Sequence, residues 1–276
     1  MWLCNKAMVV GAVVGLCVVT VSAWGADLQL IEAIKDHDHE AVLVLLKQHV
    51  DVNGREGDGA TALHWAVERD NVETIEALLS AGADVNAAND YGVTPISLAC
   101  INRNATVVKK LLIAGADPNA ATGMGETVIM TCARTGSADA LAALFDHGAE
   151  NVNAREGSHG QTALMWAATQ GNTDVVRLLL EHGADVGARS ITHRVPSWLG
   201  TGNAFESSVM LPHRGSTPLL FAARHGRIDS ARLLLDAGAD VNEVAPNGES
   251  ALVLASFSGQ GQFAAFLLER GANPNG

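Results

Sequence analysis

The 276-residue chain is poor in aromatic and in basic side chains. Phe, Trp and Tyr make up 4% of it, with a single Tyr, and 18 Lys and Arg stand against 30 Asp and Glu, a formal net charge of -12. Nucleic-acid binding draws its affinity largely from Lys and Arg contacts to phosphates. This charge balance therefore argues against nucleic acid as a partner, and the shortage of aromatic residues leaves Leu, Ala and Val to build the core.

The first 23 residues predict an export signal. Lys6 precedes an apolar run from Ala7 to Val21, which ends on Val21-Ser-Ala23, and small residues at Val21 and Ala23 fit a signal-peptidase site. The alternative is an uncleaved membrane anchor, because about 20 residues of apolar helix can span a bilayer. In either case we expect the remainder of the chain to leave the cytoplasm for a bacterial periplasm or the exterior.

Cysteine is also scarce. Of four Cys residues, Cys4 and Cys17 lie in the signal segment, which leaves Cys100 and Cys132. The sequence has no paired-Cys spacing for structural zinc and no Cys-x-x-Cys-His motif for covalent haem. An exported chain with so few Cys is expected to depend on its core rather than on disulfides.

A motif with a period of 33 residues occupies the rest of the chain. It opens with Thr61-Ala-Leu-His64 and returns at residues 94, 127, 162, 217 and 250, so that the spacings are 33, 33, 35, 55 and 33. About 21 residues after each start comes a second signature, which reads Ala81-Gly-Ala-Asp-Val-Asn86 in the first copy. Its later copies are centred on Gly115, Gly148, Gly183, Gly238 and Gly271.

Each copy has the pattern of two short helices. Apolar residues recur at helical spacing after Thr61 and again from Val72 to Leu79, and the polar stretch 69–71 separates the two runs. Thr is a good N-cap for the first helix, and Gly82 suits the left-handed turn that ends the second. Neither helix is long enough to be stable alone, so the copies are expected to stack in one dimension on their neighbours.

These motifs resemble the ankyrin repeat, whose period is 33 and whose start motif is Thr-Pro-Leu-His-x-Ala. The resemblance implies an all-α solenoid of helix-turn-helix units with β-hairpin-like fingers, which binds a protein partner. We expect a signal peptide or anchor at 1–23, an N-terminal capping repeat at 26–57, repeats at 58–90, 91–123, 124–159 and 160–189, an inserted loop at 190–216, and repeats at 214–246 and 247–276.

The two ends of the predicted stack differ. Residues 26–57 lack the start motif but keep the register, and their exterior is polar, as a terminal repeat requires. The last repeat, 247–276, lacks such a polar exterior, and we expect it to be truncated or covered by a partner. Four apolar residues are expected to lie at this open end: Phe257, Phe263, Phe266 and Leu267.

The inserted loop at 190–216 interrupts the period. The interval from Thr162 to Thr217 exceeds 33 by 22 residues, and the excess carries Trp198, Phe205 and a His-Arg pair that ends at Arg214. Aromatic and Arg side chains are the usual anchors of interfaces, and insertions in repeat arrays often project from the binding face. A tolerated surface loop that folds back onto the stack is the other interpretation.

The resemblance also implies a concave binding face made of finger tips and the exposed ends of first helices. Tyr91, Ile101 and Met124 would form an apolar strip edged by Arg134, although isolated surface apolar residues are normal. Carried over position by position, the expected partner-binding residues are Glu68, Arg69, Tyr91, Ile101, Asn102, Met124, Arg134, Thr135, His159, Thr169, Gln170, Arg224, His225 and Phe257, with Trp198, Phe205 and Arg214 in the loop.

No catalytic motif is present. The sequence lacks Gly-x-Ser-x-Gly and the phosphate-binding Gly-x-x-x-x-Gly-Lys pattern, and its His residues lack ligand spacing. We therefore expect no enzymatic activity, cofactor or metal, and a chain that is monomeric alone and meets a membrane only if residues 1–23 stay attached. An accessory or regulatory subunit of an exported enzyme, and a ligand- or metal-binding protein that uses the loop, are the alternatives.

Cys100 and Cys132 fall in the first helices of successive repeats. A disulfide needs Cα atoms within about 7 Å of each other, whereas the axes of packed helices lie about 8 to 10 Å apart. The sequence therefore predicts two buried free thiols.

The loop generates a test. Trp198→Ala and Phe205→Ala are each expected to weaken partner association about thirtyfold or more, because truncation of a buried aromatic anchor costs about 2 kcal/mol or more. Helical circular dichroism and the thermal midpoint should stay nearly unchanged, since the loop adds little to the stack, and Tyr91→Ala should have a smaller effect. Partner capture that survives deletion of residues 195–211 would show the loop to be a spacer.

Overall fold

Pairs of short helices, stacked side by side, make up the chain in the computed structural model, which describes residues 23–191 and 215–275. Within these ranges the extended backbone is limited to isolated bridges such as Arg55 to Thr61. The helices are α1 Ala23–Lys35, α2 His39–Lys47, α3 Ala62–Glu68, α4 Val72–Ser80, α5 Pro95–Ile101, α6 Ala105–Ile113, α7 Val128–Thr135, α8 Ala138–Asp146, α9 Ala163–Gln170, α10 Thr173–Glu181, α11 Pro218–Arg224, α12 Ile228–Asp236, α13 Ala251–Phe257 and α14 Gly261–Glu269.

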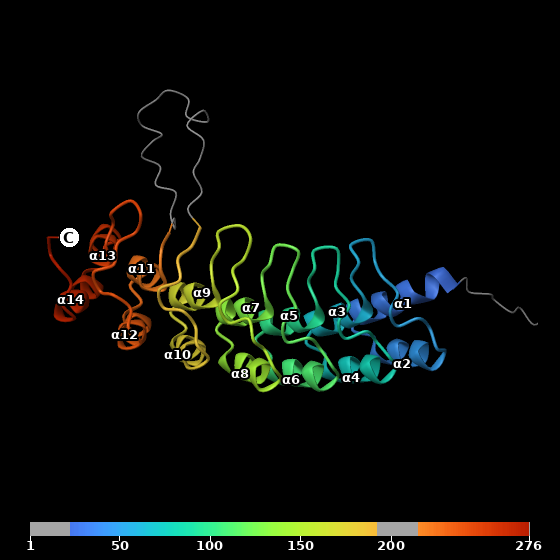
Figure 1. Ribbon diagram of the computed structural model, residues 1–276. Coiled ribbons are helices and arrows are strands. Elements are labelled where there is room, and N and C mark those ends of the chain that lie inside the picture. Colours follow the sequence, from blue (N-terminus) through green and yellow to red (C-terminus); the bar gives the residue numbers. More distant parts are fainter. Residues whose placement is uncertain (1–22, 192–214, 276) are drawn as a thin grey trace, which may run out of the picture.

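The helices form two rows. Figure 1 shows the odd-numbered helices in one row and the even-numbered helices in the other, and hairpin-like fingers project beyond the odd-numbered row. We call the odd-numbered helices the inner helices and the even-numbered ones the outer helices. This arrangement confirms the predicted all-α solenoid of helix-turn-helix units.

Capping residues mark where the helices begin and end; the start Thr and the terminal Gly were predicted, and Asn71 is a further cap that the structure reveals. At the start of α7, Thr127 Oγ1 accepts a hydrogen bond from Met130 N at 3.2 Å, and Asn71 Oδ1 accepts one from Thr74 N at 3.1 Å at the start of α4. Gly82 follows α4 with φ of 88°, a left-handed conformation in which a Cβ would be strained. Local sequence therefore determines the length of each helix before the helices pack.

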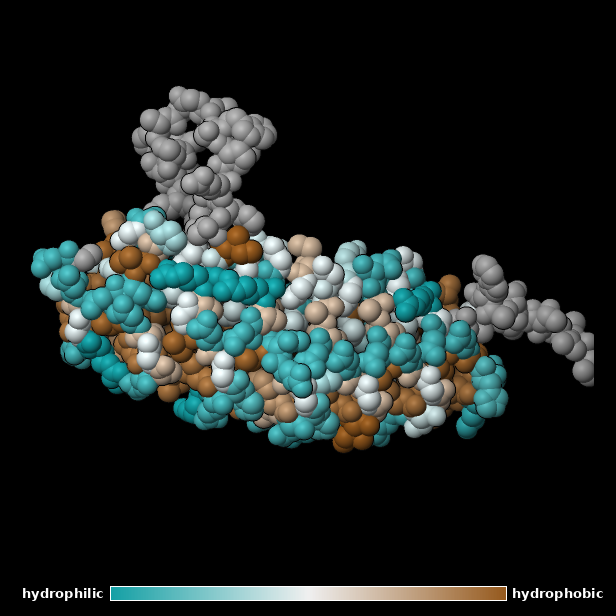
Figure 2. Space-filling model, in the orientation of Figure 1, coloured by the Kyte–Doolittle hydropathy of each residue, from teal (hydrophilic) through white to brown (hydrophobic). Residues whose placement is uncertain are grey.

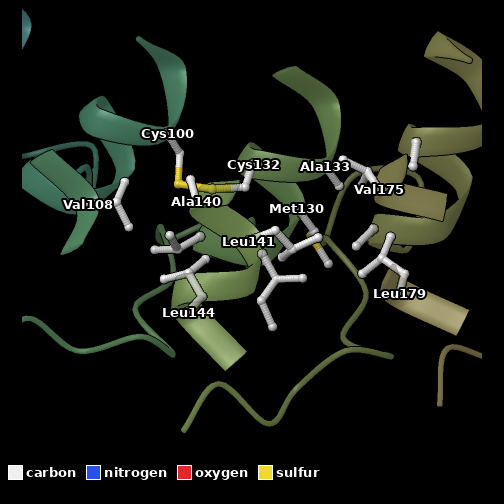
Figure 3. Packing of buried hydrophobic residues seen from close by; sticks show 14 of the residues in the cluster. Cys100, Val108, Met130, Cys132, Ala133, Ala140, Leu141, Leu144, Val175 and Leu179 are labelled. Atoms are coloured by element: carbon white, nitrogen blue, oxygen red, sulfur yellow. A yellow bond between two sulfur atoms is a disulfide. The ribbon is translucent and has the colours of Figure 1, made fainter. Parts of the chain in front are cut away.

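Small residues allow neighbouring inner helices to pack closely. The sixth position of the inner-helix motif is fully buried in every repeat from 58 onward, and the core runs without interruption along the described stack. Figure 3 shows how side chains of successive repeats meet around Met130 and Leu141. The residues at this sixth position are Ala66, Ala99, Cys132, Ala167, Ala222 and Ala255.

Asn side chains couple the turns of adjacent repeats. Asn53 Nδ2 donates to Gly82 O at 3.2 Å, and Asn53 Oδ1 accepts from Asp84 N at 2.7 Å. Equivalent bonds to the next repeat are made by Asn86, Asn119, Asn153 and Asn242. Gly187 stands in this position just before the predicted loop and has no such side chain, so the ladder is interrupted there and resumes at Asn242.

The prediction of free thiols was wrong. Cys100 and Cys132 form a disulfide between α5 and α7, with their Cα atoms 4.9 Å apart (Figure 3). The prediction compared a Cα limit with a distance between helix axes. Each Cα lies about 2.3 Å from its own axis, so Cα atoms that face one another can be about 4.6 Å closer together than the axes are.

The expected open end of the stack is less apolar than predicted. Phe263, Phe266 and Leu267 are buried, because they lie on the face of α14 that packs towards the preceding helices, and only Phe257 is exposed, with 82% of its surface accessible. The spacing of Phe263, Phe266 and Leu267 places them on one face of the last helix, and the prediction did not take this into account. None of the helices in the described part of the chain is long and apolar enough to cross a membrane.

The disulfide closes a loop with a sequence separation of 32. A double variant, Cys100→Ala with Cys132→Ala, should therefore lower the free energy of unfolding by about 2 to 4 kcal/mol through the lost constraint on the unfolded chain. Denaturant titration of oxidised protein measures this. Reductant should destabilise the parent to a similar degree and leave the double variant unaffected; labelling of both thiols in denatured, unreduced monomer would disprove the bridge.

Candidate partner-binding surface

The finger tips form a continuous ridge. Asp58, Tyr91, Met124 and His159 occupy one position, three residues before the start Thr of each repeat. Backbone hydrogen bonds join successive fingers, from Asp90 N to Asp58 O at 2.9 Å, and from Gly157 N to Met124 O at 2.7 Å. Ile191 N extends the series to His159 O at 2.7 Å. These bonds hold three pairs of neighbouring fingers in register: those at 58 and 91, at 124 and 159, and at 159 and 191.

Two of the predicted apolar residues share this ridge. Tyr91 is 71% exposed and Met124 is 63% exposed, on adjacent fingers. Gly92 permits the close approach between them, since a Cβ there would lie 2.8 Å from Gly123 N and its φ is 76°. Ile101, 46% exposed, ends α5 and so belongs to a second row of residues.

The second row runs along the ends of the inner helices. We define the helix-end edge as the seventh to tenth positions after each start: residues 35–38, 68–71, 101–104, 134–137, 169–172, 224–227 and 257–260. It contains most of the predicted partner-binding residues. Glu68, Arg69, Asn102, Gln170 and His225 are exposed, whereas Arg134, Thr135, Thr169 and Arg224 are partly buried.

Hydrogen bonds between repeats tie this edge together from segment 68–71 to segment 224–227. Asn102 Nδ2 donates to Val67 O at 2.7 Å, and Thr135 Oγ1 donates to Cys100 O at 2.9 Å. Further along, Asn172 Nδ2 donates to Ala133 O at 2.9 Å, and Arg227 Nε donates to Thr169 O at 3.0 Å. Several predicted surface residues thus also hold adjacent repeats together.

The sequence analysis missed two Trp residues beside this edge. Trp65 on α3 lies 4.4 Å below Lys35 Nζ, and its Nε1 donates to Glu56 Oε2 at 2.6 Å. Glu56 Oε1 also pairs with Lys35 at 2.5 Å, and this hydrogen bond raises the pKa of Lys35. A cation is attracted to the electron-rich face of an aromatic ring, most strongly for Trp.

The same arrangement returns three repeats later. The guanidinium of Arg134 lies 5.3 Å from the ring of Trp166, and Arg134 Nη2 pairs with Glu126 Oε1 at 3.2 Å. In both places a cation seven residues after one start covers a Trp four residues after the next start. The sequence signal for this pair is a Lys or Arg seven residues after one start together with a Trp four residues after the next start. It appears only when adjacent repeats are compared with each other.

The edge is electrostatically positive around His225. His225 is exposed as a residue but its imidazole ring is partly shielded from water; this partial burial lowers the pKa most, and the charges of Arg227 and Arg224 lower it further. Figure 2 shows hydrophilic residues along the length of the stack, with hydrophobic residues among them. The face in view is therefore partly polar and partly apolar, and is not a single apolar surface.

The titratable residues that the structure describes do not form a metal site. In the described ranges no three His, Cys, Asp or Glu side chains come close enough to hold a metal ion. His64 is buried in the start motif, where its Nδ1 accepts from Thr61 N at 3.2 Å. Trp198, Phe205 and Arg214 lie outside the residues that the structure describes.

A stack of helix pairs with a ridge of fingers defines a repeat protein of the solenoid class. A family model described as ankyrin repeats, three copies, matches residues 30–122, 120–190 and 197–276, and the chain belongs to this family. Ankyrin repeats are generally scaffolds for protein–protein interaction.

A solved structure supports the same assignment. The crystal structure of the human ASB11 ankyrin repeat domain is 27% identical, has a TM-score of 0.68, and is matched over 89% of this chain and 98% of that chain. A comparison with curated proteins found no match.

The field at His225 can be measured. Arg227→Gln should raise the pKa of His225, because removal of a neighbouring positive charge favours the protonated imidazole. NMR titration of the imidazole C–H resonances gives this pKa directly. Arg232→Gln on the outer helix α12 is the matched control and should leave it unchanged; an unchanged or lowered pKa in the Arg227 variant would contradict the assignment.

Proposed function

We propose that this protein is an exported scaffold that binds a protein partner through its fingers and inner-helix ends and catalyses no reaction itself. The observation that carries the proposal is the ridge of finger tips, on which Tyr91 and Met124 are exposed at equivalent positions of neighbouring repeats. Rigid, exposed aromatic and Met side chains are typical of interface anchors. Each of the two fingers is bonded to its other neighbour, through Asp90 N to Asp58 O and Gly157 N to Met124 O, and this order reduces the entropy lost on binding.

Two observations support export. Residues 1–23 have the charge and apolar pattern of a signal peptide, with an uncleaved anchor as the alternative. The Cys100–Cys132 disulfide is typical of an oxidising compartment, because cytosolic thiols are kept reduced. We therefore propose a periplasmic or secreted location.

The 190–216 insertion is proposed as a second contact, on the strength of its sequence alone. Trp198, Phe205 and Arg214 supply interface-type side chains in a chain that has few of them. The alternative is that the protein is an accessory subunit of an exported enzyme. It would bind this enzyme through the same surface, and would differ from a plain scaffold only in that binding changes the activity of the enzyme.

Site-directed photocrosslinking in cells that express the full chain tests the proposal. A benzophenone side chain in place of Tyr91 should form a covalent adduct with a partner protein. The same group in place of Ile113 is the control, because Ile113 is 79% exposed on the outer helix α6, away from the fingers. The adduct should be found in the periplasmic or secreted fraction.

Three results would count against the proposal. Equal adducts from both positions would mean that contact with the fingers is not specific. Failure of the Tyr91 position to form any adduct would remove the fingers from the interface. An adduct confined to the cytoplasmic fraction would contradict export while leaving the scaffold role intact.

A further inference from the structure

Charge is distributed unevenly along the helix-end edge. The first two segments, 35–38 and 68–71, contain four acidic residues and two basic ones. The five segments from 101–104 to 257–260 contain four Arg and not one Asp or Glu. The Arg residues are Arg103, Arg134, Arg224 and Arg227. In a chain with net charge -12, this acid-free stretch stands out.

Most of this positive charge is not neutralised within the described chain. Arg103 and Arg224 form no ion pair with any described residue, and Arg227 donates only to the backbone oxygen of Thr169. Arg134 alone is paired, with Glu126. Among the cations of the outer side, Lys110, Arg177 and Arg270 each pair with a carboxylate, whereas Lys47, Lys109 and Arg232 form no ion pair with a described residue. Arg103 and Arg227 are exposed and Arg224 is partly exposed, so all three are available to a ligand carboxylate.

Apolar side chains stand at both ends of the basic stretch. Ile101 and Phe257 occupy the first position of the third and seventh segments of the edge, and both are exposed. Between them the same position is held by Arg134, Thr169 and Arg224. A ligand that matches this row must combine negative charge in its middle with apolar groups at its ends.

We propose, on the basis of the scaffold function above, that the helix-end edge from Ile101 to Gln260 binds an extended acidic segment of the partner protein. Carboxylates of the segment pair with Arg103, Arg224 and Arg227, and its apolar residues contact Ile101 and Phe257. The acidic segments 35–38 and 68–71 repel the same ligand, which fixes where along the stack it lies.

The length of the segment follows from the repeat geometry. Four steps between neighbouring inner helices separate α5 from α13, and each step is about 8 to 10 Å. The row therefore spans roughly 32 to 40 Å, which an extended chain covers with about 10 to 12 residues at about 3.3 Å each. The hydrogen bonds between repeats keep the spacing constant.

An acidic peptide fits this edge better than a nucleic acid does. A duplex carries a charge every 1.7 Å or so and needs a dense set of basic contacts, whereas four Arg over this span are far apart. Single strands need aromatic platforms for stacking, and Phe257 is the one aromatic residue of the edge in the described ranges.

Selection from a displayed library of random peptides of about 12 residues, against the full chain, tests the proposal. Enriched peptides should carry several Asp or Glu with apolar residues towards both ends. A synthetic copy of the most enriched peptide, labelled with fluorescein, then gives dissociation constants by fluorescence anisotropy, and a copy with Gln for Glu and Asn for Asp should bind at least tenfold more weakly.

Two double variants that remove the same charge test whether the peptide binds at the helix-end edge. Arg103→Gln with Arg224→Gln should weaken binding of the labelled peptide about tenfold or more, because each removes an unpaired cation from the edge. Lys109→Gln with Arg177→Gln removes the same charge from the outer helices and should change binding less than twofold. Circular dichroism checks that both variants keep the fold.

Each other outcome overturns the inference. Enriched peptides without an acidic excess, or no enrichment at all, would exclude an acidic ligand, and the crosslinking at Tyr91 would still decide the scaffold function independently. Equal weakening by the two double variants would mean that only net charge matters. A single-stranded oligonucleotide that competes as well as the peptide would assign the edge to polyanions in general.

Discussion

The close approach of neighbouring inner helices is the constraint on which the rest of this structure depends. It requires a very small side chain at one position of every repeat, where Ala66 and Ala99 are fully buried. A larger residue there would separate two repeats and break the hydrogen bonds between their turns, because core packing is dense and side chains at such contacts cannot shift freely. Cys132 meets the same requirement, and its proximity to Cys100 allows a covalent bond between two repeats.

Regular stacking turns positions in the repeat into rows on the surface. Tyr91 and Met124 adjoin because they share a position in adjacent fingers, and Arg103 and Arg134 lie along one edge because they fall in equivalent segments of adjacent repeats. Partner recognition can therefore change one residue at a time while the core stays constant. The stacked pairs of Trp65 with Lys35, and of Trp166 with Arg134, show that residues of different repeats combine into one local contact.

Much of the architecture could be predicted from local signals. Start Thr residues, terminal Gly residues and apolar periodicity determine helix pairs without reference to the rest of the chain, and the 33-residue period implies stacking. Exposure of Tyr91, Ile101, Met124 and Phe257 also followed from position in the repeat. Burial of Phe263 and Phe266 was predictable in principle from the face of α14, but the prediction placed both at an open end of the stack.

The sequence by itself determined the repeat, the helix boundaries and the identity of the residues in each surface row, because these depend on neighbours within about 33 residues. Only the tertiary structure decided how near two helices come and which side chains meet across a repeat boundary. The Cys100–Cys132 bridge depends on a Cα separation of 4.9 Å, and the cover of Trp166 by Arg134 depends on the orientation of two helices. Both are distances between repeats, which composition and spacing do not contain.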